Sequence, residues 1–323
     1  MTDRKDFVGE FKDLLRDFID HKQALGYKYT TISENLRRFS VFTLNYKIEN
    51  KVLSKEIVLG WTAMRKSETI KTWEHRASDL RQFALYLQDL GYDVYIPGKK
   101  QKVRRNEYIP YIFTHEEIKR FFGVCDRLRP HTQSIKHQVL PVLFRLLYCC
   151  GLRISEAVSL KVKDLDLDLG IIMVRQSKFN KDRLVPMTES LTDILKIYRA
   201  KIHANSEQED YLLINKDGTA LTEDNSYKRF REILWKAGIS HGGKGIGPRQ
   251  HDFRHSFCVH TLNSMVNQGI DLYCALPILS TFIGHSSVSS TQRYVRLTAE
   301  VYPELIARVS LTCAYVFPEV KMK

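Results

Sequence analysis

RQHDFRHSF at residues 249–257 and IGHSSVSSTQRYVRL at residues 283–297 place two histidines, an arginine and a tyrosine where their side chains can converge. In the first stretch, His251 and Arg254 are three residues apart. If Pro248 marks the entry to a helix, the two side chains lie on one face of it. Both suit a phosphate, because a guanidinium group presents a planar fork of donors and an imidazole can donate, accept or transfer a proton. The pair therefore predicts a site for a small anion.

The second stretch adds a histidine and a tyrosine. ILSTFIG predicts a short apolar helix that ends at Gly284 in a left-handed cap and exposes His285 just beyond it. A new helix is expected to start in the serine-rich run 286–290 and to carry Tyr294. Tyrosine is an uncommon nucleophile because its free pKa is about 10, so it needs cations that stabilise the phenolate and the transition state. The neighbouring stretch supplies such cations.

At these residues the chain resembles the tyrosine recombinase (integrase) family, and its Xer-like members in particular. HDFRH corresponds to the family's H-x-L-R-H box, IGHS to its L-G-H box, and TQRYVRL to the segment with the nucleophilic tyrosine. Phe253 and Ile283 stand where the family usually has leucine, and both replacements are apolar. The boxes follow the family's order and spacing, and the resemblance covers nearly the whole chain.

GLRISE at residues 151–156 is similar to the family's first arginine box, G-L-R-x-S-E. The resemblance implies that Arg153 binds the phosphate and that Glu156 supports it. A purely structural ion pair between these two side chains is the alternative, because an arginine beside a core needs a partner.

SKFNKD at residues 177–182 is expected at the tip of a β-hairpin, since the residues before it alternate in period two and DRLVP continues the pattern after it. It resembles the family's G-K-G-N-K turn, whose first lysine is catalytic, and this implies Lys178. Ser177 and Phe179 replace the two glycines of that turn, so Lys181 stays open as an alternative. Apart from the resemblance, a lysine at a hairpin tip is most often a solvated charge.

The resemblance implies six catalytic residues: Arg153, Lys178, His251, Arg254, His285 and Tyr294. In the family's mechanism the tyrosine attacks a phosphodiester and becomes joined to the 3′-phosphate, while the two arginines and the second histidine hydrogen-bond the nonbridging oxygens. The first histidine assists proton transfer, and the lysine protonates the leaving 5′-oxygen. No metal or other cofactor is needed. The implied partner is double-stranded DNA, held by a homo-tetramer or by a hetero-tetramer with a related recombinase.

Composition agrees with a nucleic-acid partner. Of 323 residues, 50 are Lys or Arg and 37 are Asp or Glu, which gives a net charge of +13 and favours a polyanionic partner. His251 and His255 could ligate zinc, but a cation lies between them and a third ligand is not evident, so we expect no metal site. The sequence contains no run of eighteen apolar residues and no apolar signal at its start, which predicts a cytoplasmic protein without a membrane partner.

The predicted fold is mainly α with a small antiparallel β-sheet. Helical periodicity predicts an N-terminal bundle over residues 1–97, identified by resemblance as a core-binding DNA-binding domain. A basic linker without hydrophobic period follows at 98–110, and the tyrosine recombinase catalytic domain occupies 111–323. Basic residues of the bundle are candidates for a phosphate-gripping face: Lys28, Arg37, Arg38, Lys66, Lys71, Arg76 and Arg81.

Three other functions are compatible with parts of this pattern. A type IB topoisomerase would use the same chemistry on single duplexes without bringing two together. A catalytically silent DNA-binding module would explain the charge but would not need the whole set of catalytic side chains. A phage integrase with an additional arm-binding domain is disfavoured, because the helical pattern begins within ten residues of Met1. The biological role, whether integration, transposition, inversion or dimer resolution, stays open, as does exchange of the C-terminal helix between subunits.

Overall fold

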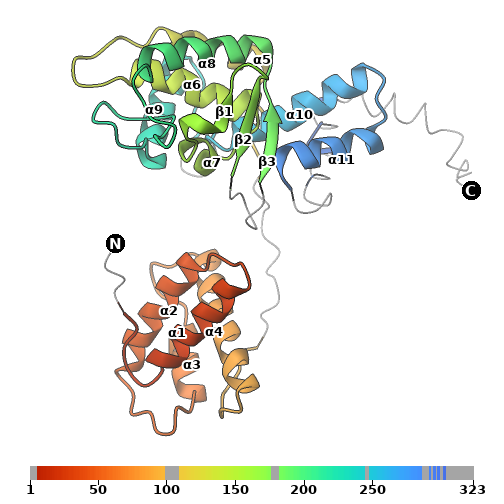
Figure 1. The fold of residues 1–323 in the computed structure, drawn as a ribbon. Helices are drawn as coiled ribbons and strands as arrows, with labels where there is room; N and C mark the ends of the chain where they lie inside the picture. The colour runs from red at the N-terminus through yellow and green to blue at the C-terminus, as the bar shows by residue number, and fades with distance from the viewer. Residues whose placement is uncertain are drawn as a thin grey trace, which may run out of the picture. The chain divides into compact units, whose positions relative to one another are not determined.

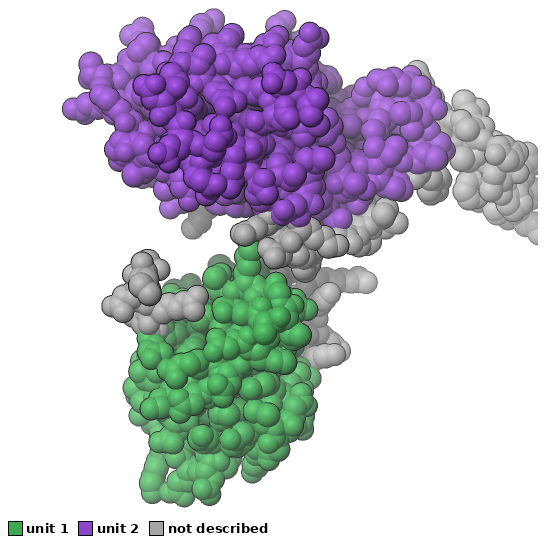
Figure 2. Space-filling view, viewed as in Figure 1, with its two compact units in different colours: residues 1–106 green, residues 107–323 purple. Residues whose placement is uncertain are grey.

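The computed structural model describes residues 6–98, 109–175, 182–243 and 247–285, together with residues 291, 294, 295, 297, 298, 301 and 302. The chain divides into two compact units, Met1–Asn106 and Glu107–Lys323 (Figure 2). The basic linker predicted at 98–110 lies outside the described residues except at its two ends. Within the described part of the chain, every helix is too short or too polar to cross a membrane.

Residues 6–98, the described part of the first unit, form four helices, and the predicted helical bundle is confirmed: α1 (Lys12–Ala24), α2 (Thr30–Thr43), α3 (Lys55–Thr62) and α4 (Ile70–Asp89) (Figure 1). Aromatic rings fill its core, where Phe11 and Phe83 meet edge to face with their centroids 6.1 Å apart. Ser54 and Thr69 start two of the helices by accepting a backbone N–H three residues on.

Arg76 corrects the expectation of a phosphate-gripping residue at that position. Its side chain is buried, and its Nε and Nη2 atoms donate to the two carboxylate oxygens of Glu68 at 2.8 and 2.5 Å. The Nη2 atom also donates to the carbonyl oxygen of Ala63, and the guanidinium stacks on Trp61. A charge buried in this way needs a partner of opposite sign, and Glu68 supplies it. Arg76 therefore fixes the turn between α3 and α4.

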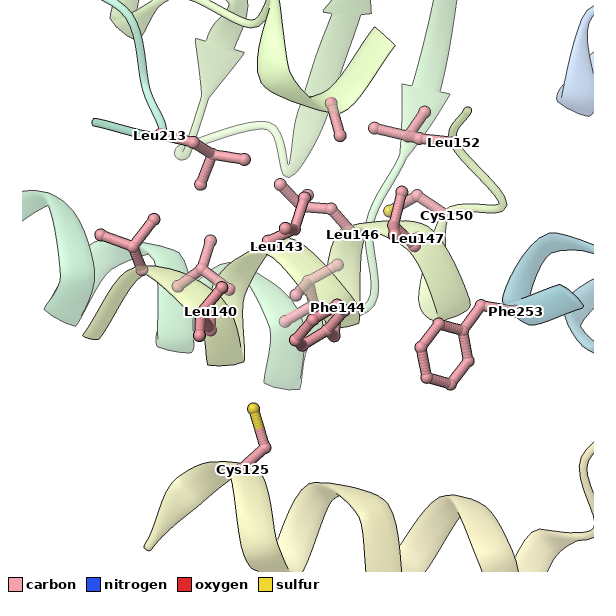
Figure 3. Packing of buried hydrophobic residues seen from close by; sticks show 14 of the residues in the cluster. Cys125, Leu140, Leu143, Phe144, Leu146, Leu147, Cys150, Leu152, Leu213 and Phe253 are labelled. Carbon is pink, nitrogen blue, oxygen red and sulfur yellow. The ribbon is translucent and has the colours of Figure 1, made fainter. Parts of the chain in front are cut away.

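The second unit is a helical domain with seven α-helices among its described residues: α5 (His115–Asp126), α6 (Lys136–Cys149), α7 (Ile154–Val158), α8 (Glu189–Ile202), α9 (Glu223–Lys236), α10 (Asp252–Asn267) and α11 (Leu272–Ile283). Apolar side chains of α6 form the centre of its core, and Phe253 from the first turn of α10 packs at one end of them (Figure 3). Phe253 is fully buried, so it fixes where α10 begins.

The sheet of the second unit is small and antiparallel, as predicted. Its strands β1 (Leu165–Asp166), β2 (Ile171–Val174) and β3 (Arg183–Pro186) pair in the order β1-β2-β3. Ile172 pairs with Val185, and both side chains are buried on the same face. Strand β3 contacts α11, and α11 lies beside α10 (Figure 1). Strand β3, α11 and α10 are therefore neighbours in the second unit.

Candidate active site

Arg254 is the most deeply buried cation of the site, with 1% of its surface exposed. It occupies the third residue of α10, and its Nη1 atom donates to the carbonyl oxygen of Gly151 at 2.5 Å. Its Nη2 atom donates to the carbonyl oxygen of Ile283 at 2.6 Å. Both acceptors lie at or just past the C-terminal end of a helix, where the helix dipole favours a cation. Arg254 thus ties α10 to the ends of α6 and α11.

Arg153 and Glu156 form an ion pair at the start of α7. The carboxylate of Glu156 accepts the backbone N–H of Arg153 at 2.9 Å and its Nη1 atom at 2.6 Å. The pairing considered as a structural alternative therefore exists, yet the side chain of Arg153 is still 22% exposed while that of Glu156 is 6% exposed. A guanidinium group has five N–H donors. The pair is thus compatible with a second, anionic ligand on Arg153.

Arg183 is a member of this cluster that the sequence did not reveal. Its Nη1 and Nη2 atoms donate to the two carboxylate oxygens of Glu156 at 3.0 and 2.9 Å, and its Nε atom donates to the carbonyl oxygen of Phe282 at 3.1 Å. The Nη1 atom of Arg254 lies 4.0 Å from the same carboxylate. The only signal in the sequence was an arginine at the start of a strand, which does not distinguish it from a surface cation.

Burial and the neighbouring charges shift the pKa of Glu156 in opposite directions. Burial alone would raise the pKa of its carboxyl group, but the hydrogen bonds from Arg183 and Arg153 lower that pKa to about 2. Three guanidinium groups surround this one carboxylate, so the cluster keeps an excess of positive charge. Such an excess favours binding of a phosphate.

His251 precedes the first residue of α10, and the residue is exposed on one side while its imidazole lies near Arg254 and Arg153. Desolvation at this position and the nearby cations of Arg254 and Arg153 lower the pKa of its imidazole, so the ring is neutral at pH 7 and can accept a proton. His251 lies at the N-cap of α10, three residues before Arg254, and the guanidinium of Arg254 points into the helix junction.

Tyr294 is buried, with 2% of its surface exposed. Its hydroxyl lies 3.0 Å from the Nδ1 atom of His255. The ring of His285 stacks on the tyrosine ring at a centroid distance of 6.1 Å. His285 itself follows Gly284, whose φ of +68° confirms the predicted left-handed cap, and its Nδ1 atom lies 3.0 Å from the hydroxyl of Thr291. The fold therefore brings the tyrosine to two histidines.

The structure brings most of the predicted residues together. One group, defined by contacts to Glu156, consists of Arg153, Arg183 and Arg254, and a second group consists of Tyr294, His255 and His285. The two groups share the first turn of α10, which carries both Arg254 and His255. Lys178 and Lys181 lie outside the described residues.

Comparison with known proteins gives consistent matches. The Phage integrase family matches residues 112–300. An integrase/recombinase of Sinorhizobium fredii is 28% identical over 315 residues, covering 94% of this chain and 98% of its own. The tyrosine recombinase XerA of Thermococcus kodakarensis is 35% identical over 205 residues, covering 62% of this chain and 63% of its own. The fold resembles that of the XerH site-specific recombinase bound to a palindromic difH substrate, with a TM-score of 0.62, 20% identity, and coverage of 93% of this chain and 85% of that one.

Proposed function

Because the chain belongs to the phage integrase family, the tyrosine recombinases, we propose that it is a site-specific recombinase that breaks and rejoins DNA through a 3′-phosphotyrosyl intermediate at Tyr294. One observation supports the proposal most strongly. The arginines that contact Glu156 and the histidine that contacts Tyr294 meet at the first turn of α10, although they come from segments far apart in the sequence. The reaction serves integration, transposition, inversion or dimer resolution.

The proposed reaction assigns one role to each residue. Tyr294 attacks the phosphorus, and its phenolic proton passes to neutral His251. Arg153, Arg254 and His285 hydrogen-bond the nonbridging oxygens. The bond from phosphorus to the 5′-oxygen breaks, and Lys178 gives that oxygen a proton. Attack by an incoming 5′-hydroxyl on the phosphotyrosine reverses these steps and reseals the strand. The bond energy is kept in the phosphotyrosine, so the cycle needs neither a nucleotide nor a metal.

Double-stranded DNA is the proposed partner. The net charge of +13 supports this, since phosphate contacts supply most of the affinity for DNA. We assign residues 1–97 to DNA binding, 98–110 to a linker along the DNA backbone and 111–323 to catalysis. Exchange between two duplexes requires four strand cleavages, so the active form is a tetramer of this chain or of this chain with a related recombinase, acting in the cytoplasm.

Sequencing of the DNA trapped covalently on the protein in cells tests this function. We expect the adducts to concentrate at a few sites with a common sequence, and two copies of such a site on one plasmid to recombine when the protein is present. Adducts scattered without a common sequence, together with relaxation of any supercoiled plasmid, would instead indicate a topoisomerase. Absence of adducts from DNA that the protein binds would indicate a silent binding module.

The role of Lys178 as the acid has its own test. An alkoxide needs a proton as it leaves, whereas a thiolate leaves readily because the pKa of a thiol is about 8.5. A substrate with sulfur at the bridging 5′ position should therefore restore cleavage by Lys178→Ala but not by Tyr294→Phe, which lacks the attacking group. Lys181→Ala is the matched control and should cleave both substrates almost normally. Sulfur rescue of Lys181→Ala would make Lys181 the acid, and rescue of neither variant would remove the acid from this hairpin.

A further inference from the structure

We propose that Arg183 is a positioning residue of the cleavage site, which joins Glu156 to the C-terminal end of α11 and thereby holds Arg153 and His285 in register on the phosphate. The inference rests on the proposed function, and it assigns a role to a side chain that belongs to none of the sequence motifs described above.

The geometry of Arg183 suits a bridge between two elements. Its two terminal nitrogens donate side by side to the two oxygens of Glu156, at 3.0 and 2.9 Å, and its Nε atom donates in a third direction to the carbonyl of Phe282 at 3.1 Å. A bidentate pair of this kind fixes orientation as well as distance. The side chains of Arg183 and Glu156 are 9% and 6% exposed, so solvent screens the pair little.

The end of α11 is held by two arginines together. Arg183 binds the carbonyl oxygen of Phe282, and Arg254 binds that of Ile283, one residue later. These are carbonyls of the last helical turn, which lack partners within the helix. Gly284 follows directly, and a Cβ atom there would lie 3.0 Å from the Nη1 atom of Arg183. The chain therefore turns against the Arg183 side chain just before it reaches His285.

Arg183 also affects how many donors of Arg153 are occupied by Glu156. Glu156 accepts three guanidinium N–H groups, two of them from Arg183 and one from Arg153. Without Arg183, the buried carboxylate would keep Arg153 as its main partner, because a buried charge without a partner is strongly destabilising. With Arg183 present, the other donors of the more exposed Arg153 remain available for the phosphate.

The test compares Arg183→Met with Arg175→Met in the full-length protein. Methionine keeps much of the length of the side chain but donates no hydrogen bond. Arg175 is the matched control, because it follows β2 at the other leg of the same hairpin and pairs with the buried carboxylate of Asp164 at 2.7 Å. Arg183→Met should form the covalent DNA adduct about 100-fold more slowly, the size expected for a small misplacement of catalytic groups, with unchanged DNA affinity. Arg175→Met should cleave at nearly the wild-type rate.

A pH profile separates positioning from a merely structural role. The pKa of Glu156 is lowered to about 2 chiefly by Arg183, so the wild-type carboxylate stays ionised under mildly acidic conditions. Loss of Arg183 raises that pKa, so cleavage by Arg183→Met should fall further as the pH decreases, through a step that the wild type lacks. The double variant Arg183→Met with Glu156→Gln has no carboxylate to titrate and should lose this step.

Three results would overturn the inference. These are a normal cleavage rate in Arg183→Met, an equal loss of cleavage rate in Arg175→Met, or a slow rate in Arg183→Met that does not fall further as the pH decreases. If Arg183→Met does not fold, Arg183→Lys replaces it, because lysine keeps the charge but cannot reach both acceptors at once. The cleavage rate of Arg183→Lys should fall less than that of Arg183→Met, and it should show the same additional decrease at low pH. A variant with a normal rate and no such decrease would also contradict the role of Arg183 as a bridge. Failure of the wild type to form an adduct in the same assay would refute the proposed function itself.

Discussion

The Tyr294→Phe variant should form no covalent adduct with DNA and should not recombine, while its affinity for DNA stays close to that of the wild type. The change removes one hydroxyl, which is the attacking group in the proposed reaction, and phenylalanine fills the same buried position. Affinity should persist because it depends mainly on phosphate contacts elsewhere. Adduct formation on a labelled duplex and a binding titration measure the two quantities in one sample.

Tyr148→Phe is the matched control for this variant. The hydroxyl of Tyr148 lies 2.9 Å from the Nδ1 atom of His260, so both tyrosines pair with a histidine of α10. If the loss of such a hydrogen bond were the cause of inactivity, both variants would lose activity. We expect only Tyr294→Phe to do so, and adducts formed by that variant would show that another residue is the nucleophile.

Arg254→Lys should cleave about 1000-fold more slowly than the wild type, the upper size found when one preorganised donor is removed from a developing oxyanion. Lysine keeps the charge but presents a single ammonium group in place of the planar fork. It therefore cannot bind the carbonyls of Gly151 and Ile283 and still face the phosphate. Single-turnover cleavage at saturating protein measures the effect without a contribution from binding.

Arg145→Lys is the corresponding control. Arg145 makes a bidentate pair with Asp126 on the partly exposed side of α6, at 2.8 and 2.7 Å. Its replacement removes the same fork geometry outside the site, and cleavage should stay within a few-fold of normal. Near-normal cleavage by Arg254→Lys would reduce Arg254 to a structural role in the helix junction.

Local patterns were sufficient to predict several elements. Thr114 and Glu117, three residues apart, form the capping box that starts α5, and Gly284 ends α11 in the predicted left-handed conformation. Both features depend on residues within a few positions of each other, which is why a single sequence reveals them. Pro141 lies inside α6, and the helix runs through it because buried side chains on both sides hold the helix in the core.

The site was only partly predictable, and the missing part consists of long-range contacts. Arg183 reaches a carboxylate 27 residues earlier and a carbonyl 99 residues later, and His255 meets Tyr294 from 39 residues away. Side-chain periodicity within one element carries no information about such pairs. The motifs supplied the residue types that a phosphate needs, while the partners that orient them emerge only when α7, β3, α10 and α11 pack together.

Identification of the residue that carries the trapped DNA tests the central claim most directly. The wild-type protein would be incubated with a duplex nicked beside the cleavage point, so that the short 5′-hydroxyl strand diffuses away and the adduct accumulates. After digestion of protein and DNA, mass spectrometry would locate the 3′-nucleotide among the 16 tyrosines of the chain. The proposed reaction places the modification on Tyr294 alone. A modification on any other residue, or bound DNA without any modification, would contradict it.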